Sequence, residues 1–214
     1  VLLLALVDQL RCTGAHADTW LVARADVVDA GWMINGVLGC PICRVERDVR
    51  GGVVLWIGDA GETSPGDGRS NHMAAPEDAD RLGALLGYAE SSTPFVICGR
   101  EAMVATALAV LADAPIILLD PPDDDAKSVA TIIRGAQTIP LAAGSARGIA
   151  LDATFDSPDR VESAVRALAK GGRLVAPISI GVPAGVREIA RDDRHWVGER
   201  EPDVITLGRA PARL

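Results

Sequence analysis

Three cysteines and one histidine near the N-terminus could together hold a metal ion. Cys12 is followed by His16, and Cys40 and Cys43 lie further along in the sequence Cys-Pro-Ile-Cys. A C-x2-C turn points two thiolates at one point, and zinc ribbons join two such turns. Three thiolates and one imidazole would form a closed tetrahedral site, which is structural and not catalytic. The pattern therefore predicts one structural zinc ion held by Cys12, His16, Cys40 and Cys43.

Other interpretations of these residues stay open. The C-x3-H spacing of the first turn is looser than C-x2-C, so His16 could be a surface histidine. Cys40 and Cys43 could be a redox pair or the remnant of a metal site. A disulfide is disfavoured in a cytoplasmic chain. Cys98 lies in a short apolar run and is predicted to be a small buried hydrophobic residue.

Composition narrows the class of protein. The chain has 214 residues, 49% of them hydrophobic, and a formal net charge of -8. No basic patch is visible and aromatic residues make up only 3%, which argues against nucleic acid as a ligand. The apolar run 1–10 is too short to span a bilayer, and the run 102–119 is interrupted by Asp113 and Pro115. We expect a soluble, cytoplasmic protein without a transmembrane segment, and peripheral association with a membrane complex stays open.

The chain divides into three segments. Residues 1–57 form a compact segment that contains three of the four cysteines. Residues 58–75 are rich in Gly, Ser, Asp and Pro and are predicted to be a linker. Residues 76–214 alternate short apolar strands with helices, which is typical of a parallel sheet covered on both faces. Strands are expected over 95–98, 116–119, 148–151 and 173–178, helices over 1–10, 76–90, 102–111, 125–134 and 158–169, and an antiparallel hairpin over 195–207.

The first segment resembles the Trm112-like zinc-ribbon proteins. The resemblance lies in the leading apolar stretch LLLALVDQLRC, the second turn GVLGCPIC and the closing stretch VERDVRGGVVLW. It covers residues 1–57, and Cys12-Thr-Gly-Ala-His16 replaces the C-P-x-C of the family. Members of this family act mainly as partner modules that stabilise methyltransferases and are not enzymes.

The last segment resembles a class I methyltransferase, which uses S-adenosylmethionine. TIPLAAGSARGIALD and SPDRVESAVRALAKGGRLVAP carry the resemblance, which covers roughly residues 93–210. It implies an α/β fold: a small zinc-ribbon-like N-terminal domain plus a Rossmann-like domain, with a mostly parallel sheet and a C-terminal antiparallel hairpin.

The cofactor loop departs from the family pattern. That loop needs glycines after the first strand so that the backbone can approach the cofactor. Only Gly99 is retained, and Glu101 and Met103 stand where further glycines are expected, so their side chains should fill the cofactor space. Asp120 follows the second strand, where an acid would bind the ribose hydroxyls. The residues that the resemblance assigns to a cofactor are thus Gly99 and Asp120, and Asp152 has no basic partner nearby in the sequence.

These observations lead to a main functional hypothesis and two alternatives. The broken loop and the lack of a catalytic set predict a non-catalytic accessory or scaffold subunit on a degenerate methyltransferase fold. Such a subunit would bind no S-adenosylmethionine and would serve a protein partner or multisubunit complex. The first alternative is an active S-adenosylmethionine-dependent methyltransferase with a built-in Trm112-like stabilising domain. The second is a redox or metal-handling protein that uses Cys40 and Cys43.

Overall fold

A single twelve-stranded sheet organises the described part of the chain. The computed structural model describes residues 1–56 and 76–202, so the predicted linker 58–75 and the end of the predicted hairpin lie outside the described residues. Among the described residues, no helix is long and apolar enough to cross a membrane.

The N-terminal part is antiparallel. It contains β1 (Leu2–Leu3), the 3-10 helix η1 (Leu4–Gln9), β2 (Val22–Asp29), β3 (Trp32–Gly39), β4 (Glu46–Arg50) and β5 (Val53–Leu55). β3 pairs with β1, β2 and β4, and β4 pairs with β5. The helix predicted over residues 1–10 is instead a short strand followed by a 3-10 helix.

The remaining elements alternate strands and helices. They are α1 (Pro76–Leu86), β6 (Phe95–Cys98), the 3-10 helix η2 (Gly99–Val104), α2 (Ala105–Leu111), β7 (Ile116–Leu119), the 3-10 helix η3 (Asp125–Ser128), β8 (Thr131–Arg134), β9 (Ala146–Ala150), the 3-10 helix η4 (Ala153–Phe155), α3 (Pro158–Ala167), β10 (Leu168–Pro177), β11 (Val186–Arg191) and β12 (His195–Arg200). The strands predicted at 95–98 and 116–119 are found at those positions.

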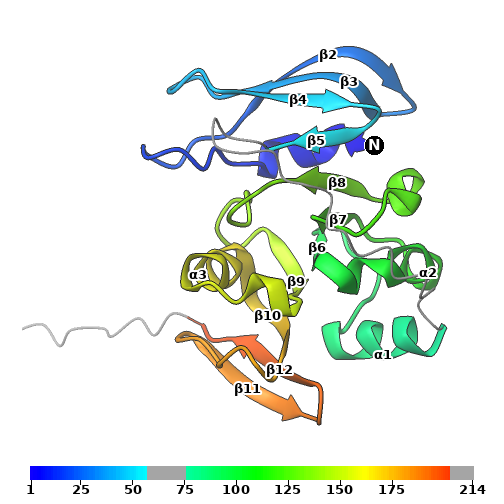
Figure 1. Ribbon diagram of the computed structural model, residues 1–214, viewed down its shortest axis with the longest axis vertical. Helices are drawn as coiled ribbons and strands as arrows, with labels where there is room; N and C mark the ends of the chain where they lie inside the picture. The colour runs from blue at the N-terminus through cyan, green and yellow to red at the C-terminus, as the bar shows by residue number, and fades with distance from the viewer. Residues whose placement is uncertain (57–75, 203–214) are drawn as a thin grey trace, which may run out of the picture.

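The strand order places the parallel strands in the middle of the sheet. It runs β1-β3-β4-β5-β8-β7-β6-β9-β10-β12-β11, and neighbours from β5 to β10 are parallel. β12 returns antiparallel to β10 and pairs with β11. Figure 1 shows the sheet descending from the N-terminal strands to the β11–β12 hairpin. The predicted α/β class is confirmed, with parallel strands in the middle of a large mixed sheet and a closing antiparallel hairpin.

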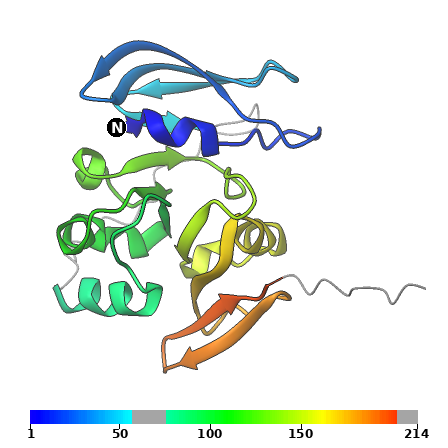
Figure 2. The same cartoon turned by 180° about the vertical axis from the view of Figure 1, so that it is seen from behind.

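Each face of the sheet has its own core. Along β6, Phe95 and Ile97 pack with the core beneath α1 and α2, whereas Val96 and Cys98 pack with the core beneath α3. All four side chains are fully buried, as expected of a parallel strand covered on both faces. Figures 1 and 2 show α3 on one side of the sheet and α1 and α2 on the other.

The N-terminal part shares the core of the α3 face. Leu6 and Leu10 belong to the same buried cluster as Val96 and Ile149. The last N-terminal strand, β5, pairs in parallel with β8 through residues 53–55 and 132–134. The antiparallel strands therefore extend the central sheet, and burial of apolar side chains joins the two parts further.

Two predicted elements differ from the structure. The helix expected over residues 125–134 is a 3-10 turn followed by strand β8, because Thr131, Ile132 and Ile133 are β-branched and fit a fully buried strand better than a helix. Of the hairpin expected over 195–207, the strand that begins at His195 is present as β12, and the second predicted strand lies outside the described residues. The antiparallel partner of β12 on its outer side is β11. β11 was missed because five of its six residues are exposed, so the apolar pattern of a strand is weak there.

Candidate functional site

The predicted metal ligands meet at one point. The ligand atoms of Cys12, His16, Cys40 and Cys43 all lie within 4.8 Å of one another. The Sγ atoms of Cys12 and Cys43 are 3.6 Å apart. His16 Nε2 lies 3.3 Å from Cys12 Sγ and 3.4 Å from Cys40 Sγ. The spacing of these residues in the sequence thus correctly predicted a four-residue cluster.

These separations match the edges of a zinc tetrahedron. Zinc–sulfur bonds of about 2.3 Å and zinc–nitrogen bonds of about 2.0 Å give edges of about 3.8 Å between sulfurs and about 3.5 Å between sulfur and nitrogen. A disulfide needs about 2.05 Å between sulfurs, and all three cysteines are free thiols. The donor set and its dimensions fit a closed structural zinc site, so the Cys3His group could bind zinc.

Surrounding backbone groups orient the ligands. His16 Nδ1 is 2.7 Å from the carbonyl oxygen of Ala17, so the proton of the imidazole lies on Nδ1 and Nε2 presents its lone pair to the cluster. The backbone N–H of Gly14 donates to Cys12 Sγ at 3.4 Å. Arg44, directly after the second turn, has a φ of 60° and lets the chain reverse beneath Cys40 and Cys43.

In the absence of a bound metal, the thiols of Cys12 and Cys43 differ in pKa. Burial is the largest influence on Cys12, and with its sulfur neighbours it raises the pKa of that thiol to about 11. The backbone N–H of Val45 holds the pKa of the exposed Cys43 thiol below its ordinary value. A bound metal would deprotonate both thiols, since thiolates are the ligand form.

A second group of polar residues lies at the carboxyl edge of the parallel strands. Gly99 follows β6, Asp120 follows β7 and Asp152 follows β9. Because β6 and β9 are neighbours while β7 lies on the other side of β6, the strand order reverses at Gly99. In open α/β sheets, ligands bind at such a switch point. The two sequence-assigned cofactor residues, Gly99 and Asp120, are therefore brought to the same edge.

Asp152 was missed as a site residue. A Cβ atom at Gly99 would lie 2.0 Å from Asp152 Oδ2, so the carboxylate needs the glycine, whose φ is 55°. Asp152 Oδ2 accepts from the N–H of Arg100 at 2.9 Å, and its other oxygen accepts from Thr154. The carboxylate is 5% exposed and fixes the loop after β6. The sequence signal was its place directly after a strand, which is common in such sheets.

Asp120 retains a carboxylate oxygen for a ligand. Its Oδ1 accepts from the N–H of Gly135 at 2.6 Å. Within the described ranges, Oδ2 has no hydrogen-bond partner. Burial raises the pKa of Asp120, and the charge of Asp152 acts in the same direction, while Arg160 and Arg134 partly offset them. The available oxygen at this edge fits the hydroxyls of a ribose.

Glu101 lies after Gly99 as predicted, and its side chain makes a contact that the sequence did not predict. Its Oε1 lies 3.3 Å from His195 Nε2 on β12. β12 and β7 lie on opposite sides of β6 in the sheet. The carboxylate of Glu101 thus contacts the strand on the opposite side of β6 from β7, the strand that Asp120 follows. Met103, the other predicted obstacle, is half-buried in η2.

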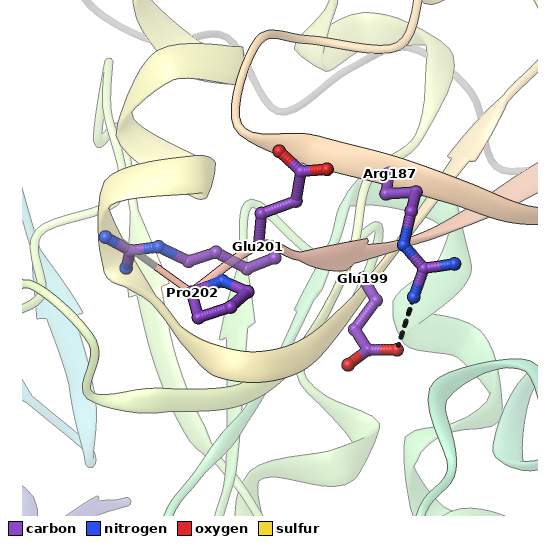
Figure 3. A pocket seen from close by; sticks show the side chains of 5 residues that line it. Arg187, Glu199, Glu201 and Pro202 are labelled. Atoms are coloured by element: carbon purple, nitrogen blue, oxygen red, sulfur yellow. Dashed lines mark ion pairs between the residues drawn. The ribbon is translucent and has the colours of Figure 1, made fainter. Parts of the chain in front are cut away.

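One pocket adjoins the Cys/His cluster, with Cys12 and His16 among its lining residues. Two other cavities lie near α3 and β11. A groove of about 840 Å³ separates α3 from the loop after β10, and Val161, Val165 and Ile180 are among the residues that line it. A smaller pocket beside β11 contains the ion pair of Arg187 and Glu199, 3.6 Å apart (Figure 3).

Comparisons with known proteins concern the fold. No protein-family model matches the sequence, and no curated protein matches it. An S-adenosylmethionine-dependent O-methyltransferase from Thermotoga maritima is 12% identical, with a TM-score of 0.44 over 61% of this chain and 67% of that one. A geranyl diphosphate methyltransferase in complex with S-adenosylmethionine is 15% identical, with a TM-score of 0.42 over 53% and 56%.

A third match is a geranyl diphosphate C-methyltransferase from Streptomyces coelicolor in complex with S-adenosyl-L-homocysteine. It is 17% identical, with a TM-score of 0.40 over 47% of this chain and 43% of that one. The chain spans about half the length of the first solved structures that it matches. This chain and the three structures share a mixed α/β fold with parallel strands in a large sheet.

These neighbours correct the functional prediction from the sequence. They are methyltransferases, and some are described with S-adenosylmethionine or S-adenosyl-L-homocysteine bound. The prediction of a non-catalytic scaffold subunit on a degenerate fold is contradicted by them and is withdrawn. The expectation that the chain binds no S-adenosylmethionine has no support from them either.

Proposed function

We propose that this chain is an S-adenosylmethionine-dependent methyltransferase with a zinc-held N-terminal segment that resembles Trm112-like proteins. The observation that carries the proposal is the group of residues at the switch point of the sheet. Gly99 is in contact with Asp152 there, and Asp120 stands at the end of the adjacent strand. A backbone turn at a glycine and an acid one strand away are the two elements with which such folds bind a nucleoside.

Each residue has a distinct part in binding. Asp120 Oδ2 would accept hydrogen bonds from the ribose hydroxyls, while Gly135 holds the other oxygen. Gly99 lets the carboxylate of Asp152 lie against the backbone of the loop, and Asp152 would keep the loop in this path through its bond to Arg100 N. When bound, S-adenosylmethionine supplies an electrophilic methyl group on a sulfonium. The chain's own residues bind it and fix the loop.

The Cys/His cluster supports the second half of the proposal. Four donors at tetrahedral separations, with Nδ1 of His16 held by a carbonyl oxygen, are the features of a structural zinc centre. Cys12, His16, Cys40 and Cys43 would be its ligands. The centre would fix the turns that precede β2 and follow β3 and would leave no open coordination position.

The central test measures the binding of S-adenosylmethionine to the purified full chain by isothermal titration calorimetry. We expect binding in the micromolar range and, for Asp120→Asn, a dissociation constant about 10- to 100-fold higher, the effect of a hydrogen bond to a charged group. Asparagine suits this test because it tolerates the φ of 47° at Asp120 and can still accept from Gly135 N.

Asp29→Asn is the matched control, because Asp29 ends β2 and is exposed. It should bind S-adenosylmethionine as the unaltered chain does. Absence of measurable binding to the unaltered, zinc-loaded chain would contradict the proposal. Equal affinities of Asp120→Asn and the unaltered chain would contradict the role given to Asp120.

A further inference from the structure

A chain of polar side chains ties three distant elements together beside the loop after β6. Arg81 of α1 contacts Nδ1 of His195 at the start of β12, with NH1 and NH2 both 3.2 Å away. Nε2 of the same ring lies 3.3 Å from Oε1 of Glu101 in η2. The side chain of His195 is 11% exposed and that of Glu101 is 26% exposed. We call these contacts between Arg81, His195 and Glu101 the latch.

The direction of each hydrogen bond in the latch follows from chemistry. A guanidinium has only donors, so Nδ1 of His195 must accept from Arg81. The ring proton therefore lies on Nε2 and is donated to the carboxylate of Glu101. Arg81 thus determines that the ring proton of His195 is on Nε2, and this N–H donates to the carboxylate of Glu101.

Asp192 anchors the latch at its outer end. It forms a close ion pair with Arg81 NH2. Its Oδ1 also accepts from the N–H of His195 at 2.7 Å and from the N–H of Arg194 at 2.8 Å. These backbone donors and Arg81 hold the pKa of Asp192 well below its usual range. Both the backbone and the side chain at the start of β12 are thus fixed relative to α1.

We propose that His195, held by Arg81, is a positioning residue that keeps the Glu101 carboxylate out of the cofactor site. Glu101 lies two residues after Gly99, so without the latch its side chain could rotate toward the carboxyl edge of β6 and β7, where Asp120 lies. A carboxylate there would occupy volume and repel the carboxylate of S-adenosylmethionine in a partly desolvated site. The inference rests on the proposed function and explains how this loop can serve a cofactor without further glycines.

The outer ion pair of Arg81 and Asp192 is not the main contribution of these contacts. Arg81 and Asp192 have side chains 27% and 39% exposed, and partly exposed ion pairs contribute little to the free energy of unfolding. The larger consequence of the contacts is the orientation of Glu101. The effect of breaking the latch should therefore depend on whether Glu101 still carries its side chain.

A double-mutant cycle measured by calorimetry with S-adenosylmethionine tests this dependence. We expect His195→Ala to raise the dissociation constant about tenfold, the lower end for loss of a hydrogen bond to a charged group. Glu101→Ala should bind at least as tightly as the unaltered chain. The double variant should bind like Glu101→Ala, because no carboxylate remains to be held. A double variant as weak as His195→Ala would overturn the proposal.

A conservative variant separates positioning from folding. His195→Gln places an amide N–H near the position of Nε2 and should retain most of the affinity. Thermal unfolding followed by circular dichroism would show that each variant is folded before its affinity is used. Loss of affinity in a folded His195→Gln equal to that in His195→Ala would count against a hydrogen bond to Glu101.

Tryptic cleavage after Arg100 tests the latch without a ligand. Arg100 is exposed at the start of η2, beside Glu101. Cleavage of the Arg100–Glu101 bond, followed by mass spectrometry, should be roughly tenfold faster in His195→Ala than in the unaltered chain and in His195→Gln. Equal rates in all three would overturn the latch. Faster cleavage in His195→Ala, together with no binding to the unaltered chain, would show a latch but overturn both its cofactor role and the proposed function.

Discussion

The Cys/His cluster and the carboxyl edge of the sheet are built in opposite ways. The cluster takes its four ligands from two turns between residues 12 and 43, joined by β2 and β3. The carboxyl edge takes its residues from loops after β6, β7 and β9 and, through Glu101, from β12 and α1. The first site depends on local turn geometry, whereas the second depends on the path of the whole sheet. Disturbing the two should therefore have different effects.

The largest expected effect comes from removal of a cluster ligand. Cys40→Ser should reduce the zinc content from about one ion per chain to none and lower the free energy of unfolding by several kcal/mol; structural zinc contributes about 10–16 kcal/mol in zinc-finger peptides. Zinc is measured by inductively coupled plasma mass spectrometry and stability by urea denaturation. Cys98→Ala is the control, because Cys98 is buried in β6 and outside the cluster. Zinc-free unaltered chain with native stability would contradict the role of the cluster.

The next effect tests whether the two parts unfold together. Leu10 and Leu108 are both fully buried, one in each core. Leu10→Ala and Leu108→Ala should each lower the free energy of unfolding by about 2–5 kcal/mol. Both should do so in a single transition, since β5 and β8 share a sheet. Val110→Ala, at an 83% exposed position, is the control. A separate early transition in Leu10→Ala would show that the N-terminal part unfolds alone.

A smaller effect concerns the charge at the carboxyl edge. Burial raises the pKa of Asp120 above its ordinary value of 3.8, so the folded chain binds this proton more tightly than the unfolded chain. As the pH rises through that range, the folded state loses stability from this group. Asp120→Asn should therefore unfold at a higher temperature than the unaltered chain at pH 7, and the difference should vanish near pH 3. A lower unfolding temperature of the variant at pH 7 would contradict the burial argument.

The smallest effect is expected at the surface pocket of Figure 3. Arg187 and Glu199 have side chains 62% and 40% exposed, and pairs of this kind contribute about 0–1 kcal/mol. Arg187→Gln should change the urea midpoint slightly in low salt and not at all in high salt, because salt screens exposed charges. A large change that persists in high salt would show that the pocket has a structural role.

The sequence predicted the elements whose pattern is local. The strands at β6 and β7 are four-residue apolar runs between polar segments, and the cluster follows from the spacing of Cys12, His16, Cys40 and Cys43. Strand β8 was missed because its four residues directly follow a polar segment with a helix-like pattern and continue it as one predicted helix, since a short apolar run does not by itself distinguish a helix from a strand. Only its pairing with β5 and β7 decides between them.

The error at Glu101 has a different origin. The position of its backbone was predicted well, beside Gly99 after the first parallel strand. The direction of its side chain depends on His195, which is 94 positions away in the sequence, so no local pattern could predict it. Asp152 shows the same difficulty, since its neighbour Gly99 comes from another strand. Such contacts are set by the order of strands in the sheet.

The parallel pairing of β5 with β8 has a consequence for synthesis on the ribosome. Val53 cannot pair with Ile132 until the segment that contains β8 has left the exit tunnel. Until then, the side of β5 that later pairs with β8 is an unpaired edge. The residues of the Cys/His cluster are all synthesised before β5 and need no later residue to meet. Because chains fold from the N-terminus as they emerge, we expect the turns around the cluster to close first. They would then hold the nascent antiparallel strands in register while the rest of the sheet is made.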